Sequence, residues 1–532
     1  MFTSKVSRPT FAILLMLIAA SMPISAFSQH ISRPISQPLP ACPVMLSPNV
    51  DARRSLMVTE VDVVSNAISL GAVMDKLIAD SGVANLTKRR LWAQWWDTQN
   101  PAPSLGLGPN CNDQVNASGA PILNDFPLDC PRNEGSETAH NPFDTSQPGF
   151  YYPIALVNRL DLAAEDGAHC GEYRVIFARD PQGGEGRNLL IFEAVLPNPN
   201  PSCGIDGCRD IAKFWARLSG IADPAIRAQM LHDFYFEGLP AAGVEPVIHA
   251  KHFGRGAGQI RTNQFMSGPS PSQWQLREFK LALVPTPDNA ARPENLLFVP
   301  VTTKDTPWGG LFNEGSSHPQ TIPFMRHFVT QLDELDKDRV TQISFSAPNR
   351  FNSGQSTASF FSESDYPAHF SPNGPFDQAI QARLNLLNSN LTPDDVVRRA
   401  RTQNCAGCHQ LSNNDNIGNG LVWPASLNFV HVHEQLTESI NGTEHFRISP
   451  ALKDEFLPHR ERVFEACLGA DCQSCQLPLT NRGSDATGTP AMSPIALPED
   501  RQVTLGSWIE WLDAELKRGW PADTLGGPAP TH

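Results

Sequence analysis

Two cysteines and one histidine stand within five residues of each other, in the run Cys405-Ala406-Gly407-Cys408-His409. Two thiols three positions apart can each form a thioether to one vinyl group of the same porphyrin, and the adjacent imidazole is then close enough to bind the iron. The spacing therefore predicts a covalent haem, attached at Cys405 and Cys408, with His409 as proximal iron ligand. Whatever fold the chain adopts must bring these three side chains to one porphyrin.

A redox pair or a zinc site would also use Cys-x-x-Cys. Zinc normally takes a second pair of ligands at similar spacing. Cys472 and Cys475 repeat the spacing, but Gln476 follows them, so this pair lacks the iron ligand. We interpret it as a disulfide element, with Cys467 as a further candidate partner, and expect a single haem.

The N-terminus has the pattern of a secretory signal peptide over residues 1–28. Lys5 and Arg8 precede an apolar run at 11–20, a helix-breaking Pro23 follows, and the small residues Ala26 and Ser28 occupy cleavage-site positions. The run is too short to span a bilayer, and no later segment has the uncharged length that an integral membrane helix needs. We therefore expect export to a bacterial periplasm.

The formal charge of the chain is −14 at pH 7, with 41 Lys and Arg against 55 Asp and Glu. This balance argues against nucleic acid or an anionic membrane as partner, and a basic redox partner protein is electrostatically easier. The oligomeric state is left open.

The chain contains 11 cysteines, and most of those outside the haem motif should pair in an oxidising compartment. The short separations make Cys203 with Cys208 and Cys111 with Cys130 the simplest pairings. Cysteine spacing alone does not determine connectivity, so other pairings stay open.

Three segments precede the haem motif. Residues 29–149 comprise a Pro-rich leader, a helical part that contains Trp92, Trp95 and Trp96 on one face, and a long loop. The tryptophans are expected to pack on a core. Residues 150–370 predict a β-rich or mixed domain of unknown function. Its expected strands are 152–157, 173–178, 189–195, 244–249, 279–284 and 296–301, with helices at 211–218 and 224–236.

Residues 376–525 resemble a class I cytochrome c domain. Thr392-Pro393-Asp394-Asp395 supplies an N-cap, a first-turn proline and acids for a helix that leads into the motif. A glycine-containing loop at 418–427 and an amphipathic helix at 503–518 complete the likeness. The resemblance implies a multidomain α+β chain in which an all-α cytochrome c-like domain follows the β-rich domain. The N-terminal part resembles no family that we identify.

The same resemblance implies two further site residues. The carbonyl of Pro424 would accept the Nδ1 proton of His409 and orient its ring. Met492, the only methionine after the motif, lies in a proline-flanked loop where such cytochromes present their sixth ligand. His431 and His433 are the main alternatives as distal ligand, because strand-like alternation would place both on one face. If Met492 is not the sixth ligand, its side chain would fill a gap beneath the haem.

Two classes of function remain open on this basis. One is electron transfer by a six-coordinate haem, which the single motif favours. The other is a haem-dependent oxidoreductase, peroxidase- or oxidase-like, whose β-rich domain binds the substrate; the size of that domain favours it. A non-redox binding protein that contains haem is a third alternative. Whether the chain is an enzyme is therefore undecided from sequence.

Overall fold

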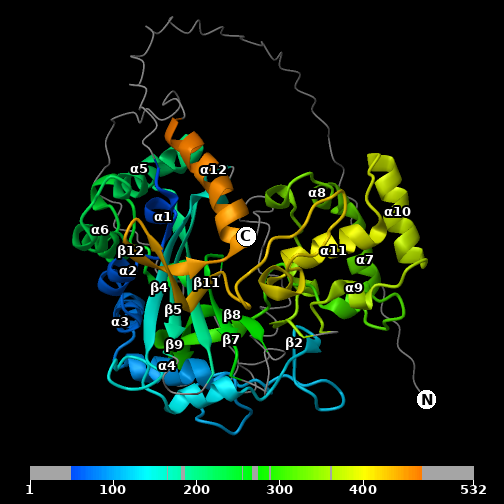
Figure 1. The fold of residues 1–532 in the computed structure, drawn as a ribbon. Helices are drawn as coiled ribbons and strands as arrows, with labels where there is room; N and C mark the ends of the chain where they lie inside the picture. The colour runs from blue at the N-terminus through cyan, green and yellow to red at the C-terminus, as the bar shows by residue number, and fades with distance from the viewer. Residues whose placement is uncertain are drawn as a thin grey trace, which may run out of the picture. The chain divides into compact units, whose positions relative to one another are not determined.

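An antiparallel sheet of eight strands lies at the centre of the described chain (Figure 1). The computed structural model describes residues 50–164, 166–180, 186–254, 256–266, 274–286, 289–359 and 362–469. The predicted signal peptide, Met492, the Cys472/Cys475 pair and the predicted helix at 503–518 lie outside these residues.

The strands of this sheet follow the order β1-β4-β5-β6-β7-β8-β10, and β9 forms a hairpin with β8. Every pair is antiparallel. Their bounds are β1 (Met57–Val58), β4 (Tyr151–Arg159), β5 (His169–Arg179), β6 (Asn188–Pro197), β7 (Gln259–Gln264), β8 (Gln275–Thr286), β9 (Asn289–Val301) and β10 (Ser356–Thr357). Five of the six expected strands lie within β4, β5, β6, β8 and β9, which confirms them.

Period-two alternation gives this sheet two chemically different faces. In β5, Tyr173, Val175 and Phe177 are fully buried on one face, among aromatic side chains. Arg174 and Ile176, the residues between them, line a cavity on the other face. The first face is called the core face below, and the second the cavity face.

The core face packs against the tryptophans of α4 (Lys88–Asp97), whose N-cap Thr87 accepts a hydrogen bond from the Arg90 N–H. Trp92, Trp95 and Trp96 are all fully buried. The Trp95 ring lies 4.2 Å from that of Phe298 in a stacked arrangement and contacts Phe192 and Phe279 edge-on. The expectation that these tryptophans belong to a core is confirmed.

The helices that surround the sheet include both of those expected in its middle part, at α5 and α6. They are α1 (Ala52–Ser55), α2 (Val61–Ala67), α3 (Leu70–Ser81), α5 (Arg209–Leu218), α6 (Pro224–Phe236), α7 (Thr321–Thr330), α8 (Leu332–Leu335), α9 (Tyr366–His369), α10 (Pro375–Leu387), α11 (Pro393–Gln403) and α12 (Leu457–Gly469). Within the described ranges, none of them combines the length and the apolar composition needed to cross a bilayer.

The strand expected at 244–249 is absent from the described sheet. Val247 and Ile248 are fully buried, but the Ile248 N–H donates to the Tyr235 carbonyl at the end of α6 instead of to a strand. A buried loop and a buried strand show the same apolar run, which is why the sequence pattern was misleading here.

Two disulfides join described residues. Cys111 pairs with Cys130, as expected, across a loop that also holds the short strands β2 (Ile122–Leu123) and β3 (Phe126–Pro127). The pairing of Cys203 with Cys208 was wrong, because Cys208 pairs with Cys170 at the start of β5. Proximity in sequence misled here, since the fold brings β5 to the end of the 3-10 segment that contains both Cys203 and Cys208.

The expectation of a separate all-α haem domain was wrong. The described part of residues 376–525 contains an antiparallel hairpin, β11 (Val432–Ile440) with β12 (Thr443–Ile448). Val396, Val397 and Ala400 of α11 belong to the same hydrophobic core as the central sheet. Among the described residues, the Cys-x-x-Cys-His motif therefore has no helical domain of its own, because its helix buries its apolar face within the core that the β-rich segment also builds.

The Trp95 cluster provides a test of this core. Trp95→Ala should lower the free energy of unfolding by roughly 3–5 kcal/mol, because it removes a fully buried indole and leaves a cavity. Leu386→Ala is a matched control on α10, since Leu386 is 75% exposed and should change stability by less than about 0.5 kcal/mol. Urea denaturation followed by circular dichroism measures both. Equal effects of the two substitutions would contradict the assigned core.

Candidate haem-binding site

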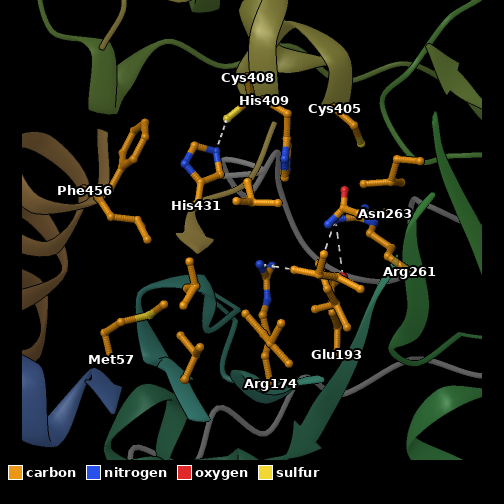
Figure 2. A pocket seen from close by; sticks show the side chains of 18 of the residues that line it. Met57, Arg174, Glu193, Arg261, Asn263, Cys405, Cys408, His409, His431 and Phe456 are labelled. Carbon is orange, nitrogen blue, oxygen red and sulfur yellow. Dashed lines mark hydrogen bonds and ion pairs between the residues drawn. The ribbon is translucent and has the colours of Figure 1, made fainter. Parts of the chain in front are cut away.

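Cys405, Cys408 and His409 all line one cavity of about 110 Å³ (Figure 2). The opposite wall is the cavity face of the sheet, with Ile176 from β5 and Ile191 from β6 among its apolar residues. The structure therefore brings together the three residues that the sequence motif singled out.

The motif is positioned by α11 and by the residue that ends it. Thr392 and Asp395 form the expected capping box at its start. At its end, the Asn404 Nδ2 donates to the Ser364 carbonyl at 2.9 Å, and its Oδ1 accepts from the Gly407 N–H at 2.7 Å. The Ala406 N–H donates to the Ser356 Oγ at 2.9 Å. Asn404 thus ties the turn between the two cysteines to the neighbouring loop.

Gly407 allows the tight turn that separates the thiols. A Cβ at this position would lie 1.7 Å from the carbonyl oxygen of Arg401, a distance that no side chain can adopt. The chain continues as a short π-helical turn, η11 (Gly407–Leu411), which carries Cys408 and His409. Close approach of the backbone therefore requires glycine between the two cysteines.

His409 is oriented by the carbonyl of Phe429, which lies 2.7 Å from Nδ1. A carbonyl oxygen only accepts hydrogen bonds, so Nδ1 carries the proton and Nε2 keeps its lone pair for a metal. Burial lowers the pKa of His409 to about 4, although the Phe429 carbonyl opposes this effect. The ring is therefore neutral at pH 7, as a haem ligand must be.

The expectation that the Pro424 carbonyl accepts this proton was wrong, because Phe429 provides the acceptor. The residues after Pro424 form a tight turn in which Leu427 and Val430 exchange backbone hydrogen bonds. Asn428 and Phe429 have φ values of 50° and 71° in this turn, which is uncommon for residues other than glycine. This left-handed turn directs the Phe429 carbonyl to His409. The number of residues between His409 and Pro424 does not reveal such a turn.

The two histidines considered as distal ligands differ in their position relative to the cavity. His431 lines the cavity, with its Nε2 3.2 Å from the Cys408 Sγ and its Nδ1 2.9 Å from the Ser449 Oγ. His433 does not line it, and its Nδ1 accepts from the Gln435 and Leu436 N–H groups. The sequence analysis missed Met57 of β1, a buried thioether that also lines the cavity.

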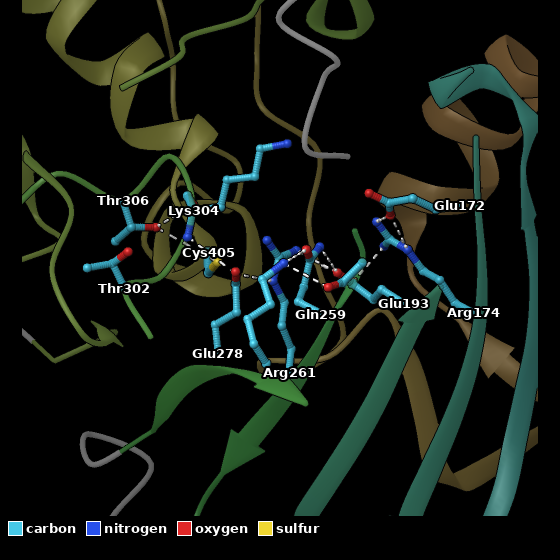
Figure 3. Close-up of polar contacts among 12 residues, drawn as sticks. Glu172, Arg174, Glu193, Gln259, Arg261, Glu278, Thr302, Lys304, Thr306 and Cys405 are labelled. Atoms are coloured by element: carbon cyan, nitrogen blue, oxygen red, sulfur yellow. Dashed lines mark hydrogen bonds and ion pairs between the residues drawn. The ribbon is translucent and has the colours of Figure 1, made fainter. Parts of the chain in front are cut away.

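A row of charged side chains crosses the cavity face beneath the motif (Figure 3). Arg174 lies 2.6 Å from Glu172 and 3.3 Å from Glu193. Arg261 lies 3.3 Å from Glu193 and 3.1 Å from Glu278. These residues, called the charge row below, alternate in sign across β5, β6, β7 and β8 because Arg174 is paired in register with Glu193, and Arg261 with Glu278.

Arg261 of the charge row keeps its charge in spite of burial. Burial lowers the pKa of Arg261, but Glu193 and Glu278 outweigh it and hold the pKa well above its ordinary value. The sequence analysis missed this row, because one charged residue in an alternating strand ordinarily indicates a face in water. The informative pattern was that a charged residue recurs in successive strands that are otherwise strongly apolar.

Arg460 of α12 adds a cation on another side of the cavity. It is 5% exposed, forms a long ion pair with Asp161 at 3.9 Å, and has an Nε without a hydrogen-bond partner among the described residues. Burial and the neighbouring Arg159 hold the pKa of Arg460 well below its ordinary value. A buried cation with an unused donor indicates that an anionic group belongs beside it. The two carboxylates of a haem meet this requirement, so the residues present fit a c-type haem.

Comparisons with family models, curated proteins and solved structures return no match for this chain. Function is therefore argued from the site itself. Within the described ranges, no three His, Cys, Asp or Glu side chains gather closely enough to hold a bare metal ion.

The two thiols of the motif take part in no disulfide, and burial raises the pKa of Cys405 to about 11 and that of Cys408 further. In haem-free folded protein, iodoacetamide should alkylate them at pH 8 roughly a hundredfold more slowly than in unfolded chain, since the thiolate is the reactive form. The rate should keep rising with pH until the pH passes about 11 for Cys405. Mass spectrometry of peptides measures this, and equal rates in folded protein and in urea would contradict the buried site.

Proposed function

We propose that this chain is an exported, periplasmic c-type cytochrome that binds one covalent haem and transfers single electrons to or from a redox partner protein. The observation that carries the proposal is the shared cavity, which both thiols and the imidazole of Cys-x-x-Cys-His line together. An accidental match to the motif has no reason to face such a cavity.

Each part of the chain has a definite task in this function. Cys405 and Cys408 provide the attachment points, and His409 offers the Nε2 lone pair to the iron. When bound, the haem supplies a centre that gains and loses one electron. The Phe429 carbonyl fixes the His409 ring and raises its basicity. The apolar residues of the cavity face exclude water, which keeps the charge change in a medium of low dielectric.

Charge compensation within the cavity supports the same proposal. Arg460, Arg174 and Arg261 all line it, and a guanidinium is well suited to pair with carboxylate groups. Arg174 and Arg261 already pair closely with acidic residues of the charge row, whereas Arg460 has only the long ion pair with Asp161 and an Nε without a hydrogen-bond partner among the described residues. We therefore assign Arg460 as the main residue that binds the haem carboxylates.

The proposed compartment is supported by the disulfides. Cys170–Cys208 and Cys111–Cys130 are the kind of bond that persists in an oxidising environment, and the bacterial periplasm is one. The formal charge of −14 supports a basic protein as the redox partner.

A second candidate function, a haem-dependent oxidoreductase of peroxidase or oxidase type, is favoured by the charge row. A simple electron carrier needs an apolar pocket, while Arg174, Glu193 and Arg261 place ionic groups on the cavity wall. Such groups would bind and polarise a small polar substrate. Rapid reaction of the oxidised protein with peroxide, lost in Arg261→Gln, would favour this candidate over the carrier.

Removal of both thiols tests the proposed attachment. Cys405→Ser combined with Cys408→Ser, produced in a host competent in cytochrome maturation, should yield protein without covalent haem, because no thioether can form. Cys467→Ser is the matched control, since Cys467 is a half-buried thiol that does not line the cavity. Intact mass reads the result. Covalent haem in the double variant, or none in the wild type, would contradict the proposal.

The distal ligand is tested by paired methionine variants. We expect Met492 to be the sixth ligand, so Met492→Ala should abolish the sulfur-to-iron absorption band of the oxidised protein while the haem stays attached through its thioethers. Met57→Ala, which alters the thioether found in the cavity, should keep the band. Loss of the band in Met57→Ala alone would assign the ligand to Met57, and absence of the band in the wild type would direct attention to His431.

A further inference from the structure

Trp274 lies between His409, which lines the first cavity, and a second cavity of about 350 Å³. The indole stacks on the His409 ring, with centroids 5.3 Å apart and planes at 25°, and on the Phe429 ring at 6.0 Å. The residue also lines the second cavity, together with Asp129, Trp308, Thr357, Ser359 and Glu363. An occupant of this cavity would therefore contact a residue that is itself in contact with the proposed iron ligand.

Two polar atoms of this lining have no partner among the described residues. One is the indole Nε1 of Trp274, a donor, and the other is Oε1 of Glu363, an acceptor when ionised. Buried polar atoms are nearly always hydrogen-bonded in proteins, so an unpaired donor and an unpaired acceptor at one cavity require an explanation. A ligand with hydroxyl groups satisfies both, because a hydroxyl group donates and accepts.

The rest of the lining is a built polar wall. Gln275 Nε2 donates to the Asp129 Oδ2 and to the Gln355 Oε1, both at 2.9 Å. The Asp129 N–H donates to that same Gln355 oxygen at 2.9 Å, and Arg277 donates to the Asp129 carbonyl. These contacts hold Asp129 in place, so the cavity keeps its shape without an occupant.

The aromatic part of the lining indicates a flat apolar occupant. Trp308 stacks on Phe126 with centroids 5.5 Å apart, just as Trp274 stacks on His409. Each indole is thus held rigidly by another ring while it contributes to the cavity lining. Large, rigid aromatic surfaces with a few polar groups are the usual composition of sites for small organic molecules.

The charges of the lining favour a neutral occupant. Burial and the neighbouring Asp129 raise the pKa of Glu363 to about 8, so this carboxyl is largely protonated at pH 7. Arg277 donates to the backbone carbonyl of Asp129 and places a guanidinium near the Asp129 carboxylate, which offsets the charge of Asp129. An organic cation would therefore find little net negative charge here.

We propose that the second cavity binds a small, uncharged, hydroxylated aromatic molecule of the phenol or catechol class, with its ring against the indoles and its hydroxyl groups paired with Glu363 and the Trp274 N–H. This goes beyond the proposed function, because binding of this kind needs no electron transfer and is measured separately from it. The test of covalent haem attachment could fail while catechol still binds here, and catechol could fail to bind while haem is attached.

The test is isothermal titration calorimetry of the full chain, as purified, with catechol as probe. One saturable site is expected. Glu363→Leu should weaken binding about fivefold or more, since it removes the hydrogen bond between this side chain and the ligand. Trp308→Ala should weaken it roughly tenfold through loss of ring packing. Glu444→Gln, which alters an exposed carboxyl of β12, is the matched control and should bind as wild type does. Circular dichroism verifies that each variant is folded.

Methyl glucoside and phenyltrimethylammonium serve as competing probes, one a non-aromatic polyol and the other an aromatic cation. Tighter binding of either than of catechol would overturn the assigned ligand class. Failure of catechol to bind the wild type would overturn the site itself, as would catechol binding that Glu363→Leu leaves unchanged. If Trp308→Ala does not fold, Glu363→Leu alone decides, because it removes the hydrogen-bonding atoms of the side chain and keeps a similar size. A shift of the haem absorption on catechol addition, absent in Glu363→Leu, would provide independent support.

Discussion

Two thiols and one imidazole can face the same cavity only if the backbone between them bends within a few residues. Gly407 permits this bend because its missing Cβ leaves room for the Arg401 carbonyl, and Asn404 holds the bend through hydrogen bonds in both directions along the chain. The rest of the site follows from this arrangement. The Phe429 carbonyl meets the ring of His409, and the sheet closes the space beneath.

The sheet serves this site because its two faces solve different physical problems. The core face buries aromatic rings, and that burial supplies most of the hydrophobic stabilisation that such a fold requires. The cavity face combines apolar side chains with the charge row. Buried ion pairs contribute little net stability, since desolvation offsets their attraction. Their presence on this face is therefore better explained by what they do for an occupant than by what they do for the fold.

Local signals in the sequence predicted local structure well. The capping box of α11, helices α5 and α6, most of the strands and the Cys111–Cys130 pair were all identified from short-range patterns. Contacts between distant segments were not, and these determine the site. Arg174 and Met57 lie hundreds of positions before Cys405, and only strand register brings them to it. The prediction of an all-α haem domain failed for the same reason, because helical periodicity identifies the apolar face of a helix but not the segment against which that face packs.

The cavity walls come from segments spread between Met57 and Arg460, and this spread governs the order of assembly. A chain emerging from its N-terminus completes the eight strands of the central sheet before the proposed attachment cysteines appear, and β11, β12 and α12 follow them. Contacts of such sequence separation are slow to form. The cavity can thus close only after α12 has packed, so maturation enzymes that act on an extended Cys-x-x-Cys-His peptide would have a period of access before this helix covers the site.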